Sequence, residues 1–315
     1  MAIAIISDIH ANKEALDAVL DDILYHVPAY NITAVHCLGD VVGYGPDPEY
    51  CARQVKRTCT VVLKGNHDEA VCNKNTDMLE QSNHDAAVSM MWTRLKLENS
   101  KHPEIVDYLA TRPIRNFPQT DDIQQRIALV HGALCTKVLN SDKKYFEDTL
   151  PNGPEKTIMD YSCLMYYSTA QLGQDYVPNI GRSFKSLISS GRNICFLGHS
   201  HCTEAFEMDP TQKTFKIIPV HMNLSKDTEI HPIELTEKSA TASLAVEPGR
   251  LYVVNFGSVG MPRSDDPRAA YGIYTGNEII FKKVPYDFPT TMHKLLTSHR
   301  LNQRTAGRLA GKLGR

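Results

Sequence analysis

Five short apolar runs punctuate the first two thirds of the chain, and each one ends directly before a group of polar residues. Short apolar runs that end in glycine and polar residues are typical of buried strands whose carboxyl ends open into a crevice. In open α/β sheets, ligands bind along that edge. We therefore expect the five strand ends to converge on one site. The five runs are residues 2–6, 34–38, 61–63, 127–130 and 194–197.

Helical periodicity lies between these runs and makes the first part of the chain an alternation of strands and helices. Asn12 can cap a helix whose apolar positions recur at helical spacing from Leu16 to Leu24. A second helix is expected over residues 48–56, and two more within 77–110. The alternation predicts an α/β fold.

Beyond residue 202 the pattern becomes rich in strands, which suits a second sheet packed on the first. Residues 221–248 are polar and irregular, and they predict a loop. Strands are expected at 203–208, 214–220, 251–256, 271–275 and 278–284.

The polar groups at the strand ends supply two Asp, one Asn and four His that can bind metal, with one further His left over. Such an inventory suits two adjacent cations, and paired cations are used most often for hydrolysis at phosphorus. The groups are Asp8-Ile9-His10, Gly39-Asp40, Gly65-Asn66-His67-Asp68, His131-Gly132 and Gly198-His199-Ser200-His201.

The spacing within these groups also favours shared metal ligation. Residues i and i+2 of an extended chain point the same way, so Asp8 and His10 can grip one ion, and His199 and His201 can grip a shared centre. Carboxylate, amide and imidazole ligands without Cys suit Mn, Fe, Zn, Co or Mg. Two dications about 3.5 Å apart would repel each other by roughly 19 kcal/mol at an effective dielectric of about 20. An anion must therefore lie between them, and Asp40 is the best protein bridge.

The ordered set D-x-H, GD, GNHD, H and GHxH, which spans residues 8–201, resembles the calcineurin-like metallophosphoesterases, in their small bacterial and archaeal phosphodiesterase branch. The segments 43–48 and 255–260 are also similar to that branch. The resemblance implies a four-layer αββα sandwich of two mixed β-sheets flanked by helices. It also implies metal-dependent hydrolysis of phosphoesters, phosphodiesters or nucleotides above all, by a hydroxide that bridges two metal ions.

The resemblance further assigns roles to the residues of the motifs. His67 would stay off the metal and protonate the leaving-group oxygen or steady the charge on the phosphoryl group. Asp68 could orient that imidazole, and Asn66 and His67 would also contact the substrate. One ion would be held by Asp8, His10, Asp40 and His201, and the other by Asp40, Asn66, His131 and His199.

Departures from the family pattern weigh against a protein phosphatase. The protein Ser/Thr phosphatases carry GDxxDRG, whereas Asp40 is followed here by the residues 41–45, which lack both that Asp and that Arg. Those enzymes also carry an Arg before GNH, where this chain has Lys64. Relatives often have Pro at the position of Phe256. Two alternatives remain: a phosphomonoesterase acting on nucleotides or phosphoproteins, and a non-catalytic scaffold that binds proteins.

Composition is that of an ordinary globular protein. The chain has 315 residues, 42% hydrophobic and 22% charged, and a formal net charge of −2, which gives no general attraction to nucleic acid or membrane. Its eight Cys lack a CxxC pair and indicate reduced thiols in the cytoplasm. We expect a small phosphorylated substrate and two divalent or trivalent ions, with Mn or Fe favoured over Zn, Ni, Co and Mg. The oligomeric state stays open.

Two segments are expected to lie outside the common fold. Residues 1–289 are interpreted as one domain with a helical insert at about 135–192, which either borders the metal site or serves packing only. Residues 290–315 carry six Lys or Arg and no acidic residue, and they predict a basic amphipathic C-terminal helix or tail. Arg263 could reach a substrate phosphate through its guanidinium group, or it could be an ordinary surface residue.

Overall fold

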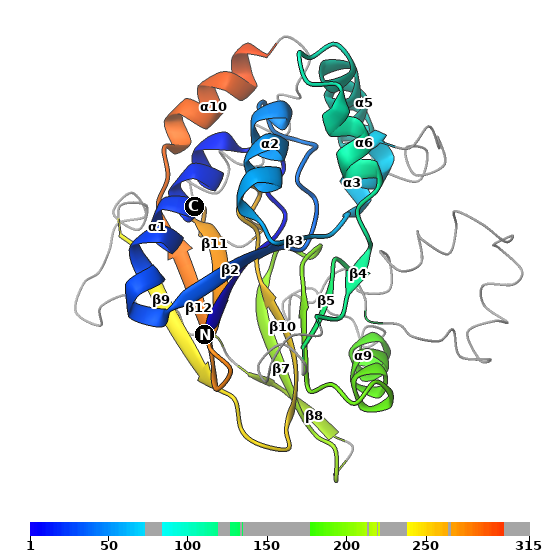
Figure 1. The fold of residues 1–315 in the computed structure, drawn as a ribbon, viewed down its shortest axis with the longest axis vertical. Coiled ribbons are helices and arrows are strands. Elements are labelled where there is room, and N and C mark those ends of the chain that lie inside the picture. Colours follow the sequence, from blue (N-terminus) through cyan, green and yellow to red (C-terminus); the bar gives the residue numbers. More distant parts are fainter. Residues whose placement is uncertain are drawn as a thin grey trace, which may run out of the picture.

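The computed structural model describes residues 1–72, 84–118, 127–132, 134, 177–212, 214–218, 220, 238–263 and 266–298 (Figure 1). In the first half of the chain it contains β1 (Ala2–Ile6), α1 (Lys13–Tyr30), β2 (Ile32–Cys37), α2 (Pro48–Thr58), β3 (Val61–Val62), α3 (Asn66–Cys72), α5 (His84–Glu98), α6 (Glu104–Ala110), β4 (Arg115–Asn116) and β5 (Ile127–Val130). The second half contains α9 (Val177–Ser189), β6 (Ile194–Leu197), β7 (Thr203–Asp209), β8 (Thr214–Ile218), β9 (Ala240–Ala245), β10 (Leu251–Phe256), β11 (Ala269–Tyr274), β12 (Glu278–Val284) and α10 (Phe288–Thr297).

The strands form two mixed sheets of six strands each, as expected. The first sheet has the order β3-β2-β1-β11-β12-β9, and the second has the order β4-β5-β6-β10-β7-β8. Within the first sheet β1, β2 and β3 run parallel, and in the second β5, β6 and β10 run parallel. The five strands that precede the polar motifs therefore lie in the parallel parts of the two sheets.

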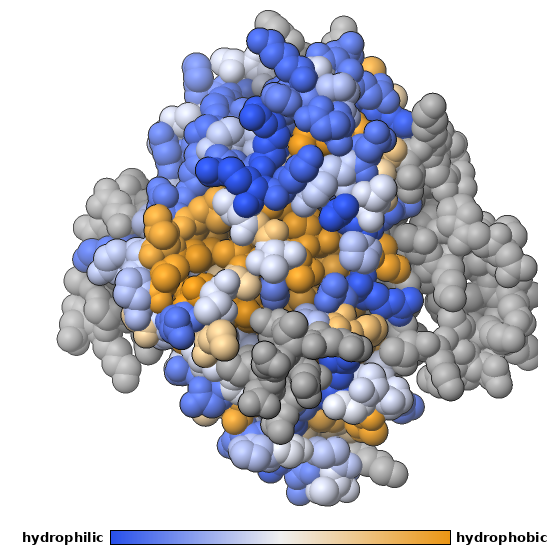
Figure 2. Space-filling model, viewed as in Figure 1, coloured by the Kyte–Doolittle hydropathy of each residue, from blue (hydrophilic) through white to orange (hydrophobic). Residues whose placement is uncertain are grey.

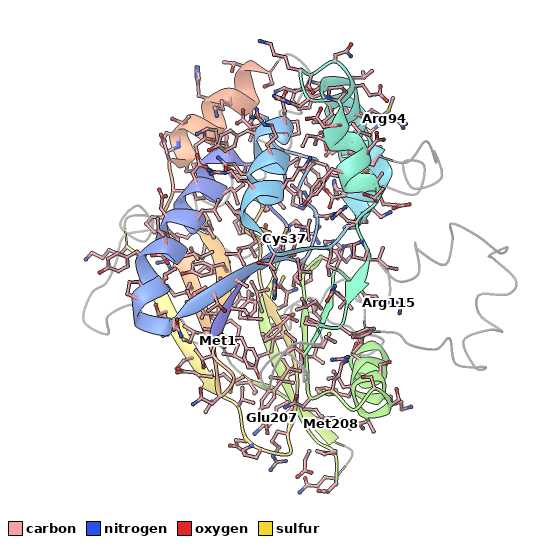
Figure 3. All side chains as sticks on the ribbon, viewed as in Figure 1. Met1, Cys37, Arg94, Arg115, Glu207 and Met208 are labelled. Atoms are coloured by element: carbon pink, nitrogen blue, oxygen red, sulfur yellow. The ribbon has the colours of Figure 1, made fainter. Side chains whose placement is uncertain are left out.

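Three apolar clusters separate the layers and confirm the predicted αββα sandwich. One cluster joins the first sheet to α1, α2, α3, α5, α6 and α10, and it contains Cys37 at the end of β2 (Figure 3). A second cluster joins α9, through Phe184 and Leu187, to the outer face of the second sheet. The third lies between the sheets, where Ile3 and Ile5 of β1 pack near Phe196 of β6. All these side chains are buried away from water, which favours the folded state.

The helix after β1 begins as the sequence predicts. The side chain of Asn12 accepts a hydrogen bond from the amide of Ala15 at 3.2 Å and so satisfies one of the free amides of the first turn of α1. The amide group of the same side chain donates to the carbonyl oxygen of Gly260 at 3.0 Å. One residue thus starts the helix and ties it to the loop after β10.

The first sheet ends in a short edge strand. Because β3 has only two residues, most of the outer edge of β2 has no strand beside it among the described residues. Ala34 and Val35 of β2 are partly exposed there. Figure 2 shows an apolar band across this face of the molecule, at the level of β2 and the adjoining part of α1.

One expectation about the second half of the chain is wrong. Residues 240–245, expected in an irregular loop, form β9, which pairs antiparallel with β12 at the edge of the first sheet. Its Ala, Thr and Ser side chains alternate too weakly in hydropathy to predict a strand, because an edge strand needs little apolar surface. The helical insert is described only from Val177 onward, in α9, and the C-terminal tail only as far as residue 298, at the end of α10. None of the described helices combines the length and apolar character that crossing a membrane requires.

Candidate metal centre

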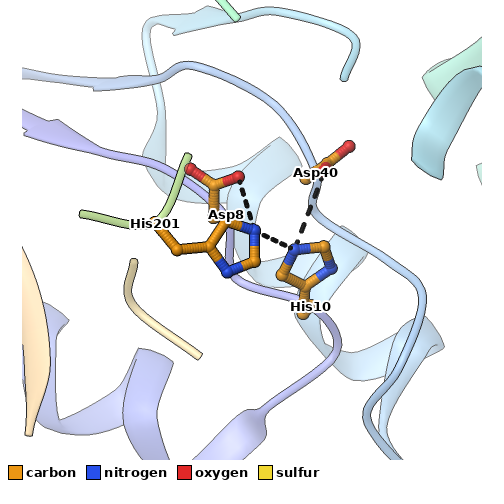
Figure 4. Close-up of side chains that lie close together, drawn as sticks. All are labelled: Asp8, His10, Asp40 and His201. Atoms are coloured by element: carbon orange, nitrogen blue, oxygen red, sulfur yellow. Dashed lines mark hydrogen bonds and ion pairs between the residues drawn. The ribbon is translucent and has the colours of Figure 1, made fainter. Parts of the chain in front are cut away.

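The structure brings all the motifs together at the carboxyl ends of β1, β2, β3, β5 and β6. In the first group, Nε2 of His201 lies 3.3 Å from a carboxylate oxygen of Asp8 and 3.1 Å from Nε2 of His10 (Figure 4). Nε2 of His10 lies 3.7 Å from Oδ2 of Asp40. One ligand atom from each of these four buried residues falls within 4.8 Å of the others. This group can hold a metal ion.

A second group adjoins the first and shares Asp40 with it. Oδ2 of Asp40 lies 3.3 Å from Nε2 of His131, and His199 completes a set whose ligand atoms also lie within 4.8 Å of one another. Oδ1 of Asn66 lies 3.2 Å from Nε2 of His131 and 2.9 Å from Nδ1 of His199. The predicted ligands thus lie in two adjoining groups that share Asp40.

Backbone carbonyl groups orient three of the imidazoles. Nδ1 of His10 lies 3.3 Å from the carbonyl oxygen of Val42, and Nδ1 of His131 lies 2.9 Å from that of Leu38. Nδ1 of His201 lies 2.5 Å from the carbonyl oxygen of Met261. Because a carbonyl oxygen can only accept, each Nδ1 must carry a proton, and each Nε2 faces the centre. Lone pairs facing one another across 3.1 Å, as in His10 and His201, fit a cation between them.

The two carboxylates sit in different electrostatic environments. Burial raises the pKa of Asp8 to about 6, and the nearby Asp40 adds to this effect. Burial acts in the same direction on Asp40, but the positive charges of His131 and His67 outweigh it and hold the pKa of Asp40 well below its usual value. The charge of Asp40 in turn overcomes the effect of burial on His131 and raises its pKa to about 9.

The other imidazoles of the centre are held neutral. Burial lowers the pKa of His199 to about 3, and it lowers the pKa values of His10 and His201 well below their usual range. The charge of Arg263 acts in the same direction on the pKa of all three rings. Neutral imidazoles are the form that binds metal, so the site is prepared for cations without losing protons from these rings.

The ligand loops adopt unusual backbone conformations. Five of the seven predicted ligands have positive φ angles, which non-glycine residues rarely adopt: Asp8 at 55°, His10 at 49°, Asp40 at 51°, His199 at 66° and His201 at 60°. Such strain clusters at functional sites, where the surrounding structure holds it. The glycines of the motifs leave room for the ligands. A Cβ at Gly65 would strike the carboxylate of Asp40, and one at Gly198 would strike the side chains of Ser7 and Asp8.

His67 lies beside the centre but belongs to neither ligand group. Its amide donates to Oδ1 of Asp40 at 2.8 Å, and its ring centroid lies 4.7 Å from that of His10. Its Nδ1 is buried and has no hydrogen-bond partner among the described residues. Burial lowers its pKa. This position agrees with a histidine that acts on substrate and not on metal.

Asp68 has a different position from the one expected. Its carboxylate accepts hydrogen bonds from the amides of Val41 and Val42 at 3.0 and 3.1 Å and from the amide of Gly65 at 3.0 Å. Burial raises its pKa to about 7. Asp68 thus joins the loop after β2 to the loop after β3, and no hydrogen bond between it and His67 is found in the described part of the chain.

Among three further basic residues, Arg263 lies near the centre and two others are engaged elsewhere. The amide of Arg263 lies 3.5 Å from the carbonyl oxygen of His201, and its side chain is exposed. Lys64 forms an ion pair with Glu69 and donates to the carbonyl oxygen of Ala110 at 3.0 Å. Arg268 is buried and binds Asp266.

Three residues that support the centre were missed by the sequence analysis. The hydroxyl of Ser258 donates to the carbonyl oxygen of Asp8 at 2.8 Å. The side chain of Asn255 donates to the carbonyl oxygen of Gly198 and to the hydroxyl of Ser200, each at 2.8 Å. Tyr44 packs against two histidines of the site. All three lie in the segments 43–48 and 255–260, which marked a resemblance but carried no residue roles.

Two mixed sheets with a cluster of Asp, Asn and His at their strand ends are typical of the metallophosphoesterases. Residues 1–203 match the family model described as calcineurin-like phosphoesterase, and the match includes every predicted metal ligand. The chain therefore belongs to the calcineurin-like phosphoesterase family, whose members are phosphoester hydrolases.

Two relatives match over nearly the whole chain. An uncharacterized protein of Methanocaldococcus jannaschii is 27% identical over 296 residues, which cover 93% of this chain and 91% of that protein. The crystal structure of a metallophosphoesterase from Sphaerobacter thermophilus superimposes with a TM-score of 0.64 at 24% identity, covering 99% of this chain and 100% of the other. The second likeness establishes a shared fold.

Proposed function

We propose that the protein hydrolyses phosphodiesters or nucleotides at a centre of two metal ions. The observation that carries this proposal is the position of Asp40. Its Oδ1 is occupied by the amide of His67, whereas its Oδ2 faces Nε2 of His10 on one side and of His131 on the other. A single oxygen that faces two imidazoles, one after β1 and the other after β5, is suited to bridge two cations.

The donor set fits hard or borderline divalent ions. One ion would be held by Asp8, His10, Asp40 and His201, and the other by Asp40, Asn66, His131 and His199. Two such ions would supply Lewis acidity to the phosphoryl group and lower the pKa of water for attack on phosphorus. Mn and Fe suit this mixture of carboxylate, amide and imidazole best.

The chain's own residues would handle the substrate. The position of His67 beside the two ligand groups, without belonging to either, supports a role at the leaving-group oxygen. The exposed Arg263, whose charge is felt by the histidines of the centre, would hold a phosphoryl oxygen. Lys64 is paired with Glu69, which argues against the phosphate-binding role of the Arg that protein phosphatases carry before GNH.

The decisive experiment combines metal analysis with a substrate panel. Metal-stripped protein is loaded in turn with Mn, Fe, Ni, Co, Zn or Mg and assayed with bis(4-nitrophenyl) phosphate, 4-nitrophenyl phosphate and nucleotides. We expect two ions per chain and faster hydrolysis of the diester. His67→Ala should lower turnover by about 100-fold or more while both ions stay bound, and His102→Ala, outside the centre, serves as the matched control.

The other functions considered give different results in the same assays. Faster hydrolysis of the monoester, or of a phosphopeptide, would identify a phosphomonoesterase. If the folded wild-type protein shows no turnover with any of the metals, a protein-binding scaffold would be favoured. Full activity of Asp40→Asn with normal metal content would contradict the proposed centre.

A further inference from the structure

Tyr44 is the bulkiest residue with a left-handed backbone in the described part of the chain. Its φ angle is 58°, and only 5% of its surface is exposed. A large side chain at positive φ costs on the order of 1–2 kcal/mol and persists only where the surroundings hold it. Gly43 and Gly45, which tolerate positive φ, lie on either side of it, yet the bulky Tyr44 adopts this conformation as well.

The ring of Tyr44 packs against two histidines of the site at once. Its centroid lies 4.5 Å from that of His67 and 4.8 Å from that of His10. Gly43 allows this approach, because a Cβ there would strike Nδ1 of His67. The loop therefore brings an aromatic face onto the imidazole that we place at the leaving group.

The main chain of Tyr44 is fixed from the opposite side. Its amide donates to the hydroxyl of Ser89 at 2.9 Å, and that hydroxyl donates to the carbonyl oxygen of Ala86 at 3.2 Å. Both residues belong to α5, which contacts α2, α3 and α6 and contributes Ala86 and Met90 to the apolar cluster on that side of the first sheet. A helix outside the ligand loops thus holds the strained turn in place.

No carboxylate among the described residues fixes the orientation of the His67 imidazole by a hydrogen bond. Asp68, its neighbour in sequence, directs its carboxylate to three backbone amides. The Asp that follows the GD motif in protein phosphatases is absent, and the segment 41–45 that replaces it contains Tyr44. The imidazole of His67 instead packs against the rings of Tyr44 and His10.

We propose that Tyr44 is a positioning residue that holds the His67 imidazole against the leaving-group oxygen. The inference rests on the proposed function. In the step concerned, an oxygen from water bonds to phosphorus and the bond from phosphorus to the leaving oxygen breaks. The electron pair of that bond goes to the leaving oxygen, which takes a proton from the ring of His67. The proton given up by the attacking water then restores the protonated histidine.

The test varies the leaving group and the ring at position 44 together. Methyl phosphate diesters of 4-nitrophenol and of phenol differ in how much the departing oxygen needs a proton. Tyr44→Asn removes the ring with a residue that tolerates positive φ, and Tyr44→Phe keeps the ring as the matched control. We expect Tyr44→Asn to lower kcat for the phenyl ester about tenfold more than for the nitrophenyl ester, and Tyr44→Phe to preserve the ratio.

Two further measurements separate positioning from a general structural effect. His67→Gln should show the same dependence on the leaving group, and adding Tyr44→Asn to it should leave the ratio of the two rates unchanged. In metal-free protein with ¹³C-labelled histidine, the ring signal of His67 should show greater mobility in Tyr44→Asn but not in Tyr44→Phe. Metal content is measured in each variant, because Tyr44 also touches His10.

Equal loss of rate for both esters, with an unchanged ring signal of His67, would overturn the inference. If Tyr44→Asn does not fold, Tyr44→Gly, which removes both the ring and the backbone strain, replaces it. A wild-type protein that hydrolyses neither ester in any metal would refute the proposed function instead. The ring mobility would then still decide whether Tyr44 holds His67.

Discussion

The amide of His199 donates to both carboxylate oxygens of Asp8, at 3.1 Å each, across a separation of 191 residues. Asp8 follows β1 of the first sheet, and His199 follows β6 of the second. The contact therefore joins the two sheets at the centre. It holds a carboxylate whose burial is unfavourable to its charge, as its raised pKa of about 6 shows.

Replacing Asp8 by Asn should stabilise the metal-free protein at neutral pH. The carboxyl group of Asp8 ionises near pH 4 in the unfolded chain but at about 6 in the fold, so stability falls as the pH rises through that window. The side-chain amide of the variant cannot ionise, and we expect a gain of about 1–3 kcal/mol at pH 7.5. Urea unfolding of both proteins measures it. Excess Mn²⁺ should reverse the order, and an Asn variant that is weaker without metal would refute this account.

Asp40→Asn should have the opposite effect on the same metal-free protein. The positive charges of His131 and His67 keep the pKa of Asp40 below its unfolded value, so its charge stabilises the fold at all pH values above that range. Its removal should lower the free energy of unfolding by about 1–3 kcal/mol at pH 7.5. Because Asp40 lies in both ligand groups, elemental analysis should also show loss of both ions. Retention of one ion would show that the groups bind independently.

His36 should make the protein sensitive to acid independently of the metal centre. The ring is buried in β2, and neither nitrogen has a hydrogen-bond partner among the described residues. Burial lowers its pKa from 6.5 to about 4, so the unfolded chain binds a proton first and stability falls as the pH drops from 6.5 towards 4. At pH 5 this loss amounts to about 2 kcal/mol.

His36→Leu removes the titrating group and puts an apolar side chain of similar size in its place, on the strand that pairs with β1 and β3. Urea unfolding at pH 7.5 and at pH 5.0 should show a loss that is about 2 kcal/mol smaller in the variant than in the wild type. The metal ligands titrate equally in both proteins, so their contribution to the change in unfolding free energy with pH cancels in this comparison. An identical loss in the two proteins would mean that His36 is hydrated or hydrogen-bonded in solution.

The ligand groups could be predicted from sequence because each is a local pattern at the end of an apolar run. The αββα layers followed from the same patterns and the family resemblance. The role of Asp68 could not be predicted, because adjacency to His67 does not reveal that its carboxylate reaches Val41 and Gly65. Tyr44 was missed for a similar reason: its importance comes from a positive φ angle and from packing across the fold, and neither has a sequence signature of its own.

Gly65→Ala should disable the centre through one added methyl group. A Cβ at Gly65 would strike the carboxylate and the amide of Asp40, so the carboxylate must move or the loop must open. We expect a loss of roughly 1–3 kcal/mol in stability, as for other overpacked sites, together with reduced metal content by elemental analysis. Gly181→Ala in α9 is the matched control, because a Cβ there meets no atom within 4 Å. Alanine favours helix, so this control should be neutral or stabilising by about 0.4–1 kcal/mol. Normal metal content in Gly65→Ala would show that the close packing of the two loops is not what sets the position of Asp40.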